Sequence, residues 1–394
     1  MKKILLLGGS AQQVVAIETA KRLGYFTVLC DYLPDNPGQF FADVFYQVST
    51  TDKDAVLQVA INEKIDGIVA YASDPAAPTA AYVAEKMVLP GNPYKTVNTF
   101  CHKDLFRKFL AENGFNVPKS KGFSDDDSID ISEMSLPVIV KPVDSSGSKG
   151  VTVIYDLSEL TAAVEFAFSY TRSHRVIIEE FIEKSHPYLI GGDIFVIDGK
   201  VTLWGLLNCH RDDTVNPLVP VGKSYPLNLS MDDELLAKLT LQQMVTRSGF
   251  QTGAMNVELV IDRNHRCWLI DIGPRNGGNM IPDLLGYIFN IDIIEMTIRA
   301  AMGDNLAQNE YCYATHNLHT DKDGEFLNVW FSPEIEPFIV RKNIYKKTGD
   351  PVHYFNNASD AIGIVFFKFQ NQKVMHDFID NINQHIHVNI IENK

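Results

Sequence analysis

The chain has 394 residues, enough for roughly two to three domains, and its hydrophobic fraction of 45% is ordinary for globular protein. Its 35 basic and 49 acidic residues leave a formal net charge of -14. This balance argues against a nucleic-acid or anionic-membrane surface, because such surfaces need a basic excess. No stretch approaches the about 18 apolar residues of a membrane span. The five cysteines are scattered and form no C-x-x-C pair, which favours a reducing, cytoplasmic setting.

Residues 1–98 alternate strand and helix patterns. An apolar run at 3–7 is followed by a helical pattern that Gly24 closes, and a second strand ends in Asp31. Repeated β-α-β units predict a parallel, Rossmann-like sheet. The turn "GGSAQQ" lacks the second and third glycines of a dinucleotide motif, so a nicotinamide dehydrogenase is not expected. The helix start after Gly9 still suits a small anion.

The rest of the chain divides into two further segments. The stretch "LPGNP" marks a boundary, and a helix is predicted from residue 103 to a stop at Gly114. Beyond it, many of the strands are predicted to be antiparallel. The last segment has a strand at 361–369, a helix near 373–383 and an alternating end. The predicted domains are therefore 1–98, 99–305 and 306–394.

The stretch "KPVDSSGSKG", residues 141–150, has the small residues and lysines of a phosphate loop. It does not fit the G-x-x-x-x-G-K-[ST] spacing of a Walker loop, and both of its flanks read as strands. It is therefore predicted to be a hairpin tip whose backbone N–H groups fold over phosphates, with Lys141 as a fixed charge on the strand. On the loop alone, a solvated polar turn is an equal alternative.

A second hairpin brings two carboxylates together. In "NVELVIDRNHRCWLIDIG", a tight turn at Asn264-His265 would pair Asp262 with Cys267, and the same register sets Glu258 opposite Asp271. Facing carboxylates repel unless something neutralises them or one side chain swings out to solvent. A Mg²⁺ ion held by one or two carboxylates and by substrate phosphates would do so. A phosphate loop therefore predicts a nearby carboxylate pair that holds the metal, and the carboxylate pair predicts a phosphate ligand.

Taken with "HKDLFRKFLAENG" and the strand exit "IIEEFI", these motifs resemble the ATP-grasp superfamily in five ordered places over residues 1–305. The resemblance is to carboxylate-amine ligases with a carbamoyl-phosphate-synthase-like or biotin-carboxylase-like first domain. It implies an α/β and α+β fold in which a Rossmann-like parallel-sheet domain precedes two subdomains that grip ATP, followed by a small C-terminal α+β segment.

The resemblance also implies the site residues. Lys103 and Lys141 would contact ATP, and Arg275 would stabilise the transferring phosphoryl group, with Lys141 counted as catalytic beside it. The metal, Mg²⁺ or Mn²⁺, would be held by Glu258 and Asp271. The remaining nucleotide contacts would come from the phosphate loop, Ser145, Ser146, Gly147, Ser148, Lys149 and Gly150, and from the strand exit, Glu179, Glu180, Phe181, Ile182 and Glu183, with Glu179, Phe181 and Ile182 facing the base.

Two departures from the family pattern affect the site. The second metal strand commonly reads Glu-x-Asn-Pro-Arg, whereas this chain has Gly273 in place of the Asn, so Asn276 or Asn279 would have to supply the missing amide. The ribose-binding glutamate expected after the strand exit is also absent, and Glu183 is the available substitute.

Residues 208–226 read as a polar loop and form the candidate substrate surface, with an exposed crossover loop as the alternative. The candidate substrate residues are His210, Arg211, Lys223, Asn276 and Arg299. The predicted reaction is ATP-dependent activation of a small-molecule carboxylate for attack by an amine. A bicarbonate-using carboxylase and a non-catalytic ATP-binding regulatory subunit are the alternatives. No nucleic-acid or membrane partner is expected, and a homodimer is the expected assembly for the superfamily.

Overall fold

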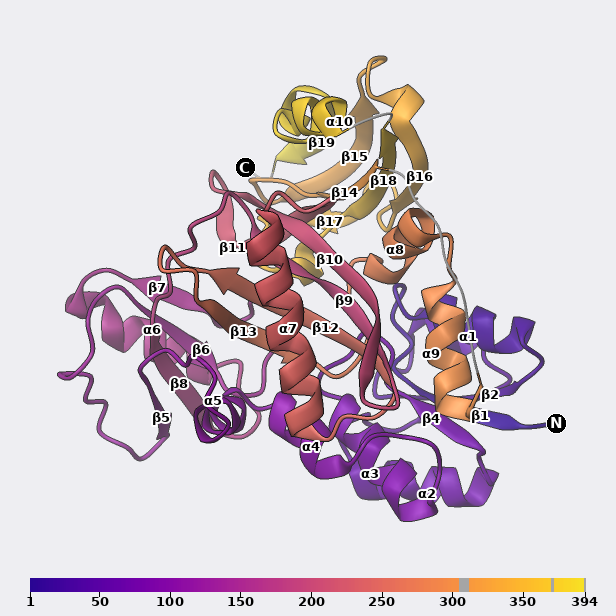
Figure 1. The fold of residues 1–394 in the computed structure, drawn as a ribbon. Coiled ribbons are helices and arrows are strands. Elements are labelled where there is room, and N and C mark those ends of the chain that lie inside the picture. Colours follow the sequence, from indigo (N-terminus) through magenta and orange to yellow (C-terminus); the bar gives the residue numbers. More distant parts are fainter. Residues whose placement is uncertain (305–311, 370–371, 393–394) are drawn as a thin grey trace.

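The computed structural model describes residues 1–304, 312–369 and 372–392 (Figure 1). The chain begins with a four-stranded parallel sheet in the order β3-β2-β1-β4, which confirms the predicted Rossmann-like domain. The core strands are buried along their length, as expected when helices cover both faces. Its elements are β1 (Lys3–Leu7), α1 (Val14–Arg22), β2 (Phe26–Asp31), β3 (Val44–Gln47), α2 (Lys53–Glu63), β4 (Gly67–Val69), α3 (Ala77–Met87) and α4 (Tyr94–Phe100).

The turn after β1 is closed by its own side chains. The Gly9 N–H donates to Asp31 Oδ2 at 2.7 Å, and the Ser10 N–H donates to Gln13 Oε1 at 2.9 Å. Two amide groups in the turn before the helix, where an anion was expected to bind, are therefore already bound within the protein.

A small four-stranded sheet follows, in the order β5-β8-β6-β7. Helix α6 packs on one face of it through alanine and valine side chains. Because side chains alternate along a strand, Lys141 and Glu179 point to the other face. Strands β6 and β7 are antiparallel neighbours, as predicted for the flanks of the phosphate loop. The elements are α5 (Lys103–Glu112), β5 (Ser120–Ser124), β6 (Val138–Pro142), β7 (Thr152–Ile154), α6 (Leu160–Phe168) and β8 (Arg175–Glu180).

The central sheet has eight strands in the order β13-β12-β9-β10-β11-β14-β18-β16, and every neighbouring pair is antiparallel. Helix α7 covers one face, with the apolar side chains of α5 in the same core cluster, and α8 covers part of the other face. The elements up to residue 304 are β9 (Leu189–Ile197), β10 (Lys200–Asp212), β11 (Asn216–Tyr225), α7 (Met231–Ser248), β12 (Gly253–Ile261), β13 (Cys267–Gly273), α8 (Ile281–Phe289) and α9 (Ile293–Met302).

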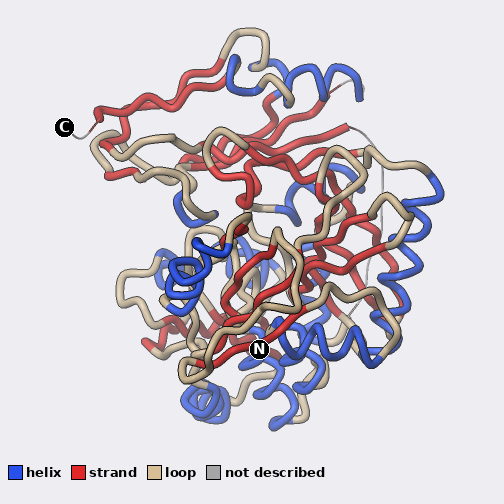
Figure 2. Tube along the Cα trace, turned by 90° about the vertical axis from the view of Figure 1, so that its left-hand side faces the viewer, coloured by secondary structure: helices blue, strands red, loops and turns tan. Residues whose placement is uncertain are grey.

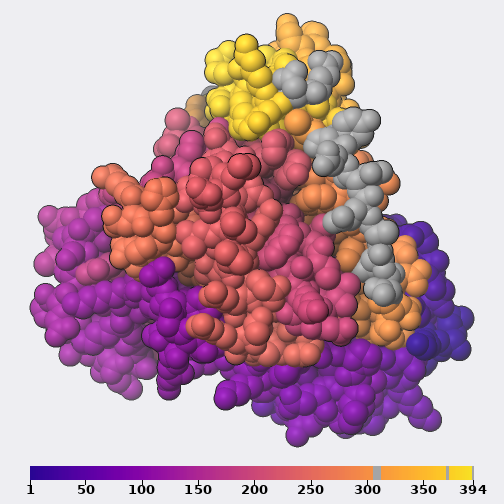
Figure 3. Space-filling model, viewed as in Figure 1, coloured from indigo at the N-terminus to yellow at the C-terminus, as the bar shows by residue number. Residues whose placement is uncertain are grey.

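Helix α9 ties the central sheet back to the first domain. Its residues Ile294, Ile298 and Met302 pack with α1 against the parallel sheet. In the space-filling view the small sheet and its helix form a lobe on the left, set off from the first domain by a notch (Figure 3).

The C-terminal segment continues the central sheet and adds a three-stranded sheet in the order β17-β15-β19. This sheet lies at one end of the molecule in Figure 2. The predicted strand, helix and alternating end are confirmed. The proposed boundary at residue 305 lies outside the described residues. The elements are β14 (Cys312–Leu318), β15 (Gly324–Phe331), β16 (Ile339–Ile344), β17 (Pro351–Val352), β18 (Gly363–Phe369), α10 (Gln372–Ile379) and β19 (Ile386–Glu392).

Across the described residues, none of the helices combines the length and the apolar character needed to traverse a bilayer.

Candidate active site

A cleft of about 420 Å³ lies between the small sheet and the β12–β13 end of the central sheet. Apolar side chains, including Ile139, Leu189 and Val260, form much of its wall, and charged groups gather beside them. A largely apolar pocket with a few convergent polar groups is the usual form of a nucleotide site. The predicted residues that line it are Lys103, Lys141, Ser145, Ser146, Gly147, Ser148, Glu179, Glu180, Phe181, Ile182, Glu183, Arg211, Glu258 and Asp271.

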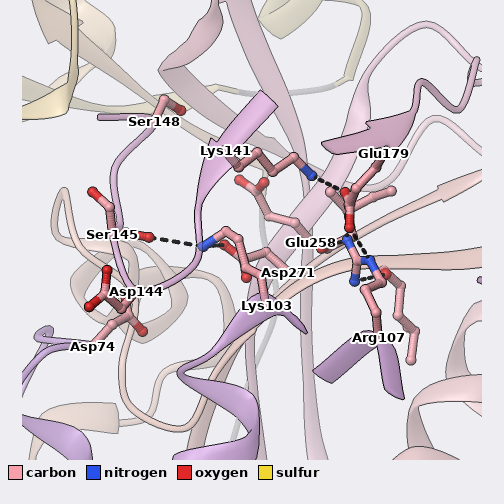
Figure 4. Close-up of polar contacts among 12 residues, drawn as sticks. Asp74, Lys103, Arg107, Lys141, Asp144, Ser145, Ser148, Glu179, Glu258 and Asp271 are labelled. Atoms are coloured by element: carbon pink, nitrogen blue, oxygen red, sulfur yellow. Dashed lines mark hydrogen bonds and ion pairs between the residues drawn. The ribbon is translucent and has the colours of Figure 1, made fainter. Parts of the chain in front are cut away.

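Two nearly buried lysines enter this cleft from different elements (Figure 4). Lys103, at the start of α5, donates to the Ser145 carbonyl at 2.9 Å, and its Nζ lies 3.5 Å from Asp271 Oδ2. Lys141, on β6, lies 2.6 Å from Glu179 Oε2. Burial lowers the pKa of Lys141, while Glu179 acts in the opposite direction. Both ammonium groups are thus held at the cleft, in the arrangement predicted for phosphate binding.

Glu179 is bound by two cations, which corrects the expectation that it faces an adenine base. Arg107 approaches it with two nitrogens, Nε at 2.6 Å from Oε1 and Nη2 at 3.2 Å from Oε2, and Lys141 takes the remaining side. Burial alone would raise the pKa of Glu179, but the cations of Arg107 and Lys141 lower it to about 2. Glu179 therefore holds Lys141 in place rather than offering a free acceptor.

Glu258 and Asp271 are directly opposite each other on β12 and β13, as predicted. Each has a cation nearby: Arg211 Nη2 is 3.8 Å from Glu258 Oε1, and Lys103 is 3.5 Å from Asp271. Their side chains keep 28% and 41% of their exposure, so both carboxylates are open to the cleft. The repulsion expected between them is reduced by these cations even before an ion binds.

This donor set fits Mg²⁺. In the described part of the chain, no group of three or more His, Cys, Asp or Glu side chains could hold a metal by itself. Two oxygen donors beside two lysines instead match an ion that keeps several waters and takes its other ligands from phosphate groups. The pair is thus suited to a metal that arrives with a nucleotide.

The turn that leads to this pair differs from the prediction. Cys267 pairs with Ile261, not with Asp262, and an irregularity in register between Glu258 and Leu259 then restores the expected pairing of the carboxylates. Asp262 instead closes the turn, because its side chain accepts hydrogen bonds from the backbone N–H groups of Asn264 and Arg266 at 2.9 and 3.0 Å. The register irregularity is a β-bulge at Ile270.

The phosphate loop is anchored at both sides of its tip. The Asp144 carboxylate accepts from Thr171 Oγ1 and from the Ser173 N–H, each at 2.8 Å, and Ser148 Oγ donates to the Leu218 carbonyl at 2.9 Å. Gly150 has a φ of +71°, and an added Cβ would lie 2.8 Å from Pro142 Cγ. Lys149 and Gly150 are not among the cleft-lining residues. The set of residues predicted to cover the phosphates is therefore reduced to 145–148.

The strand exit after β8 is tied to residues 135 and 137 by hydrogen bonds. The Phe181 N–H donates to the Pro137 carbonyl at 3.0 Å, and Glu180 Oε1 accepts from the Ser135 N–H at 2.8 Å. Glu183, the suggested ribose ligand, lies 3.2 Å from Arg263 at the exposed rim. The Phe181 and Ile182 side chains line the cleft, as predicted.

Residues 208–226 are not a polar loop, which corrects the sequence interpretation. They form much of the β10–β11 hairpin inside the central sheet, and several of their polar side chains hydrogen-bond within it, such as Asn208 to Ser224 Oγ and Arg211 to the Leu218 carbonyl. His210 Nε2 lies 2.8 Å from Ser224 Oγ, and burial lowers the pKa of His210 to about 3. By strand alternation His210 lies on the face opposite Glu258, so it is removed from the substrate candidates.

The other two substrate candidates of this hairpin, Arg211 and Lys223, lie on the Glu258 face. Arg211 lines the cleft itself. Lys223 is nearly buried, its Nζ lies 2.6 Å from Cys209 Sγ, and it would be 3.3 Å from a Cβ at Gly191, the residue that pairs with Glu258. Both remain candidates for contact with an anionic substrate.

Arg275, Asn276 and Arg299 do not line the cleft. Arg275 forms an ion pair with Asp74 of the first domain, and Arg299 pairs with Glu295 at 2.8 Å on α9. Arg299 is accordingly withdrawn from the substrate candidates. Asn276 is fully buried, and neither atom of its amide has a hydrogen-bond partner among the described residues.

Neither suggested replacement for the missing amide lines the cleft with Glu258 and Asp271. Asn276 borders a separate cavity of about 100 Å³ beside α3. The Asn279 N–H donates to Gln12 Oε1 at 2.6 Å. The expectation that one of them supplies the amide lost at position 273 is not supported.

The structure gives a local reason for glycine at position 273. An added Cβ would lie 2.5 Å from Asp74 Oδ1 and 2.8 Å from Arg275 Cζ. Asp74 was not predicted as a site residue, and its place beside β13 could not be read from a spacing of about two hundred residues. Gly273 therefore makes room for the ion pair between Asp74 of the first domain and Arg275, which follows β13.

We expect Gly273→Asn to destabilise the protein by about 1 to 3 kcal/mol, because its side chain would occupy the space of the Asp74–Arg275 pair. Urea unfolding would measure this cost. The double variant Gly273→Asn with Asp74→Ala should be destabilised by less than the sum of the two single variants, because the clash with the carboxylate is absent once Asp74 is removed. If the single variant unfolds like the wild type, the close approach does not explain the glycine.

Sequence comparison finds a family profile that matches part of the chain. The profile described as D-ala D-ala ligase C-terminus matches residues 110–187. An uncharacterized protein, y4rH of Sinorhizobium fredii, is 24% identical over 81% of this chain and 68% of its own length. A formate-dependent phosphoribosylglycinamide formyltransferase of Prochlorococcus marinus is 32% identical over 46% of this chain and 48% of its own length. The chain thus spans about half the length of that second relative.

Solved structures cover the whole chain. An L-amino acid ligase from Bacillus licheniformis superposes with a TM-score of 0.83 at 19% identity, over 100% of this chain and 99% of its own. The biotin carboxylase domain dimer of a Hydrogenobacter thermophilus 2-oxoglutarate carboxylase, solved with MgADP and bicarbonate, has a TM-score of 0.75 at 16% identity over 100% and 92%. The chain therefore has the ATP-grasp fold, as its motifs predicted.

Proposed function

We propose that this protein is an ATP-dependent ligase that activates a small-molecule carboxylate as an acyl phosphate, which an amine then attacks to form an amide or peptide bond. One observation carries the proposal: Lys103, Lys141 and the facing pair Glu258 and Asp271 line the same cleft. The likeness in fold to an L-amino acid ligase supports it.

In this reaction the protein would mainly position the reactants and stabilise the charge that develops on the phosphoryl group. Bound Mg²⁺ or Mn²⁺ would neutralise phosphate charge, and Glu258 and Asp271 would hold it. Lys103 and Lys141 would bind phosphate oxygens, and residues 145–148 would cover them. The substrate carboxylate oxygen would bond to the γ-phosphorus as the bond to ADP breaks. The amine nitrogen would then displace phosphate from the carbonyl carbon and lose a proton.

The role first assigned to Arg275, stabilising the transferring phosphoryl group, stays a prediction. Its guanidinium is bound to Asp74, and this carboxylate raises the pKa of Arg275 against the lowering effect of burial. A phosphoryl group would have to compete with Asp74 for this arginine, or Arg275 would act through its charge alone.

Bicarbonate as the activated carboxylate is the second candidate. The likeness to a biotin carboxylase domain solved with bicarbonate favours it. A regulatory ATP-binding subunit is the third, and the replacement of the family Asn by Gly273 favours that alternative. The three differ in what they predict for ADP release.

The test is ADP release from Mg-ATP with pooled carboxylic acids, with and without pooled amines, for the wild type and Glu258→Gln. Release that needs both pools and is lost in Glu258→Gln supports the ligase. The exposed carboxylate of Glu325 provides the control, because Glu325→Gln changes the same charge on β15, which contributes no residue to the cleft. Release with bicarbonate alone would favour the carboxylase, and ATP binding without release would favour the regulator.

The proposed setting is the cytoplasm, because all five cysteines are free thiols, as is usual in a reducing compartment. The proposed partners are the carboxylate and the amine. A homodimer is also proposed, on the likeness to a carboxylase domain described as a dimer, and sedimentation at two protein concentrations would test it.

A further inference from the structure

Arg107 is a buried cation on α5 that contacts β8 and β13, two strands that contribute residues to the proposed nucleotide cleft. It lies on the inward face of α5 with Lys103, Phe106 and Leu110, and only 3% of its surface is exposed. A buried guanidinium is costly unless its donors are paired. The hydrogen bonds that offset this cost go to the Glu179 carboxylate and to the carbonyls of Leu269 and Ile270, just before Asp271 in the chain.

The first set of contacts leads to the phosphate lysine. Arg107 binds both oxygens of Glu179, and Glu179 in turn binds Lys141 at 2.6 Å. The planar guanidinium matches a carboxylate in this two-point geometry, which a lysine does not. Arg107 therefore fixes the orientation of the carboxylate that holds Lys141.

The second set leads to the metal pair. Arg107 Nη1 donates to the Leu269 carbonyl at 3.2 Å, and Nη2 donates to the Ile270 carbonyl at 2.7 Å. These carbonyls belong to β13, which is the edge strand of the central sheet. Arg107 thus satisfies edge carbonyls at the bulge that immediately precedes Asp271.

That bulge decides whether the two carboxylates can meet. From Ile261–Cys267 to Leu259–Leu269 the strands pair without interruption, and continuing this register would set Glu258 opposite Ile270. Asp271 would then pair with Val257 and point to the opposite face of the sheet, because a slip of one residue reverses every side chain. The extra residue at the bulge returns Asp271 to the face of Glu258.

We propose that Arg107 is a positioning residue that sets the nucleotide lysine and the metal carboxylates together, by holding Glu179 on one side and the bulge carbonyls on the other. This inference rests on the proposed nucleotide and metal site. It predicts that one side chain, which touches neither nucleotide nor ion, controls how much Mg²⁺ adds to ATP binding.

The test is calorimetric binding of a non-hydrolysable ATP analogue, with Mg²⁺ and with EDTA, to the full-length protein. We expect Arg107→Met to reduce the gain in affinity that Mg²⁺ provides by at least tenfold. Glu179→Gln should weaken binding with and without the ion but preserve most of that gain, because the bulge contacts remain. Arg107→Lys should stay close to Arg107→Met, since an ammonium cannot bridge both sets of acceptors.

Arg175→Met is the matched control, because Arg175 also forms an ion pair with α5, through Asp104, but touches neither Glu179 nor the bulge. Its Mg²⁺-dependent gain should stay within twofold of the wild type. The proposal is overturned if Arg107→Met keeps that gain while folded. If Arg107→Met does not fold, Arg107→Lys decides the question by the same measure. A wild type that binds the analogue with no gain from Mg²⁺ would instead overturn the proposed site.

Discussion

Replacing Lys141 with methionine should reduce ADP release by about a hundredfold or more. Methionine keeps the apolar stem of the side chain but removes the charge, and loss of an electrostatic contact to a reacting group costs on the order of 3 kcal/mol of barrier. Glu179 keeps its two-point contact with Arg107, so the fold should survive. Steady-state ADP release with the active substrate pools would measure the loss.

Lys121→Met is the control for this variant. Lys121 lies on β5 of the same small sheet and is exposed; its ammonium group donates to the Asp130 carbonyl at 3.1 Å and lies over the Phe123 ring, away from the cleft-lining residues. Its removal should leave ADP release within twofold of the wild type. A Lys141→Met protein that unfolds normally and still releases ADP at the wild-type rate would remove Lys141 from the phosphate site.

Replacing Asp271 with asparagine should lower ADP release by a similar factor and raise the Mg²⁺ concentration needed for half-maximal release. Asparagine preserves the size of the side chain but removes one of the two negative charges that attract the ion. Asp271→Asn would also remove the carboxylate 3.5 Å from Lys103. The positive charge of Lys103 would then be less neutralised and would attract phosphate more strongly, which acts against the loss in rate. The decisive measurement is therefore the Mg²⁺ titration rather than the rate at one concentration.

Asp321→Asn, on the exposed surface of the C-terminal segment, controls for the change in net charge. It should shift neither the rate nor the Mg²⁺ titration. An Asp271→Asn titration that overlays the wild-type curve would mean that the ion is held elsewhere.

Sequence patterns correctly predicted those elements whose structure depends on residues close together in the chain. The parallel first sheet follows from repeated β-α-β units, and the β6–β7 hairpin follows from two apolar flanks around a polar tip. The meeting of Glu258 and Asp271 was also predicted, but from a turn that does not form. The bulge corrected an error of one residue, and no spacing in a single sequence reveals a bulge.

Contacts between segments far apart in the sequence were the main features that could not be predicted. Arg107 sits on the apolar stripe of its helix, four residues after Lys103 and one after Phe106, and this position was the signal that it is buried. Its acceptors lie 72 and about 160 residues away, beyond any local pattern. In the β10–β11 hairpin, polar residues such as His210 and Ser224 satisfy each other inside the sheet, so polarity was mistaken for exposure.

The continuation of the central sheet into the C-terminal segment has a consequence for how this chain can be divided. Strand β11 pairs with β14, which begins at residue 312. A chain shortened to residue 305 would leave β11 with a row of unpaired backbone groups along residues 222–225, and such an edge recruits other strands. The shortened protein should therefore aggregate although its predicted nucleotide motifs are all present, and residues 1–305 and the C-terminal segment are best regarded as a single unit of folding.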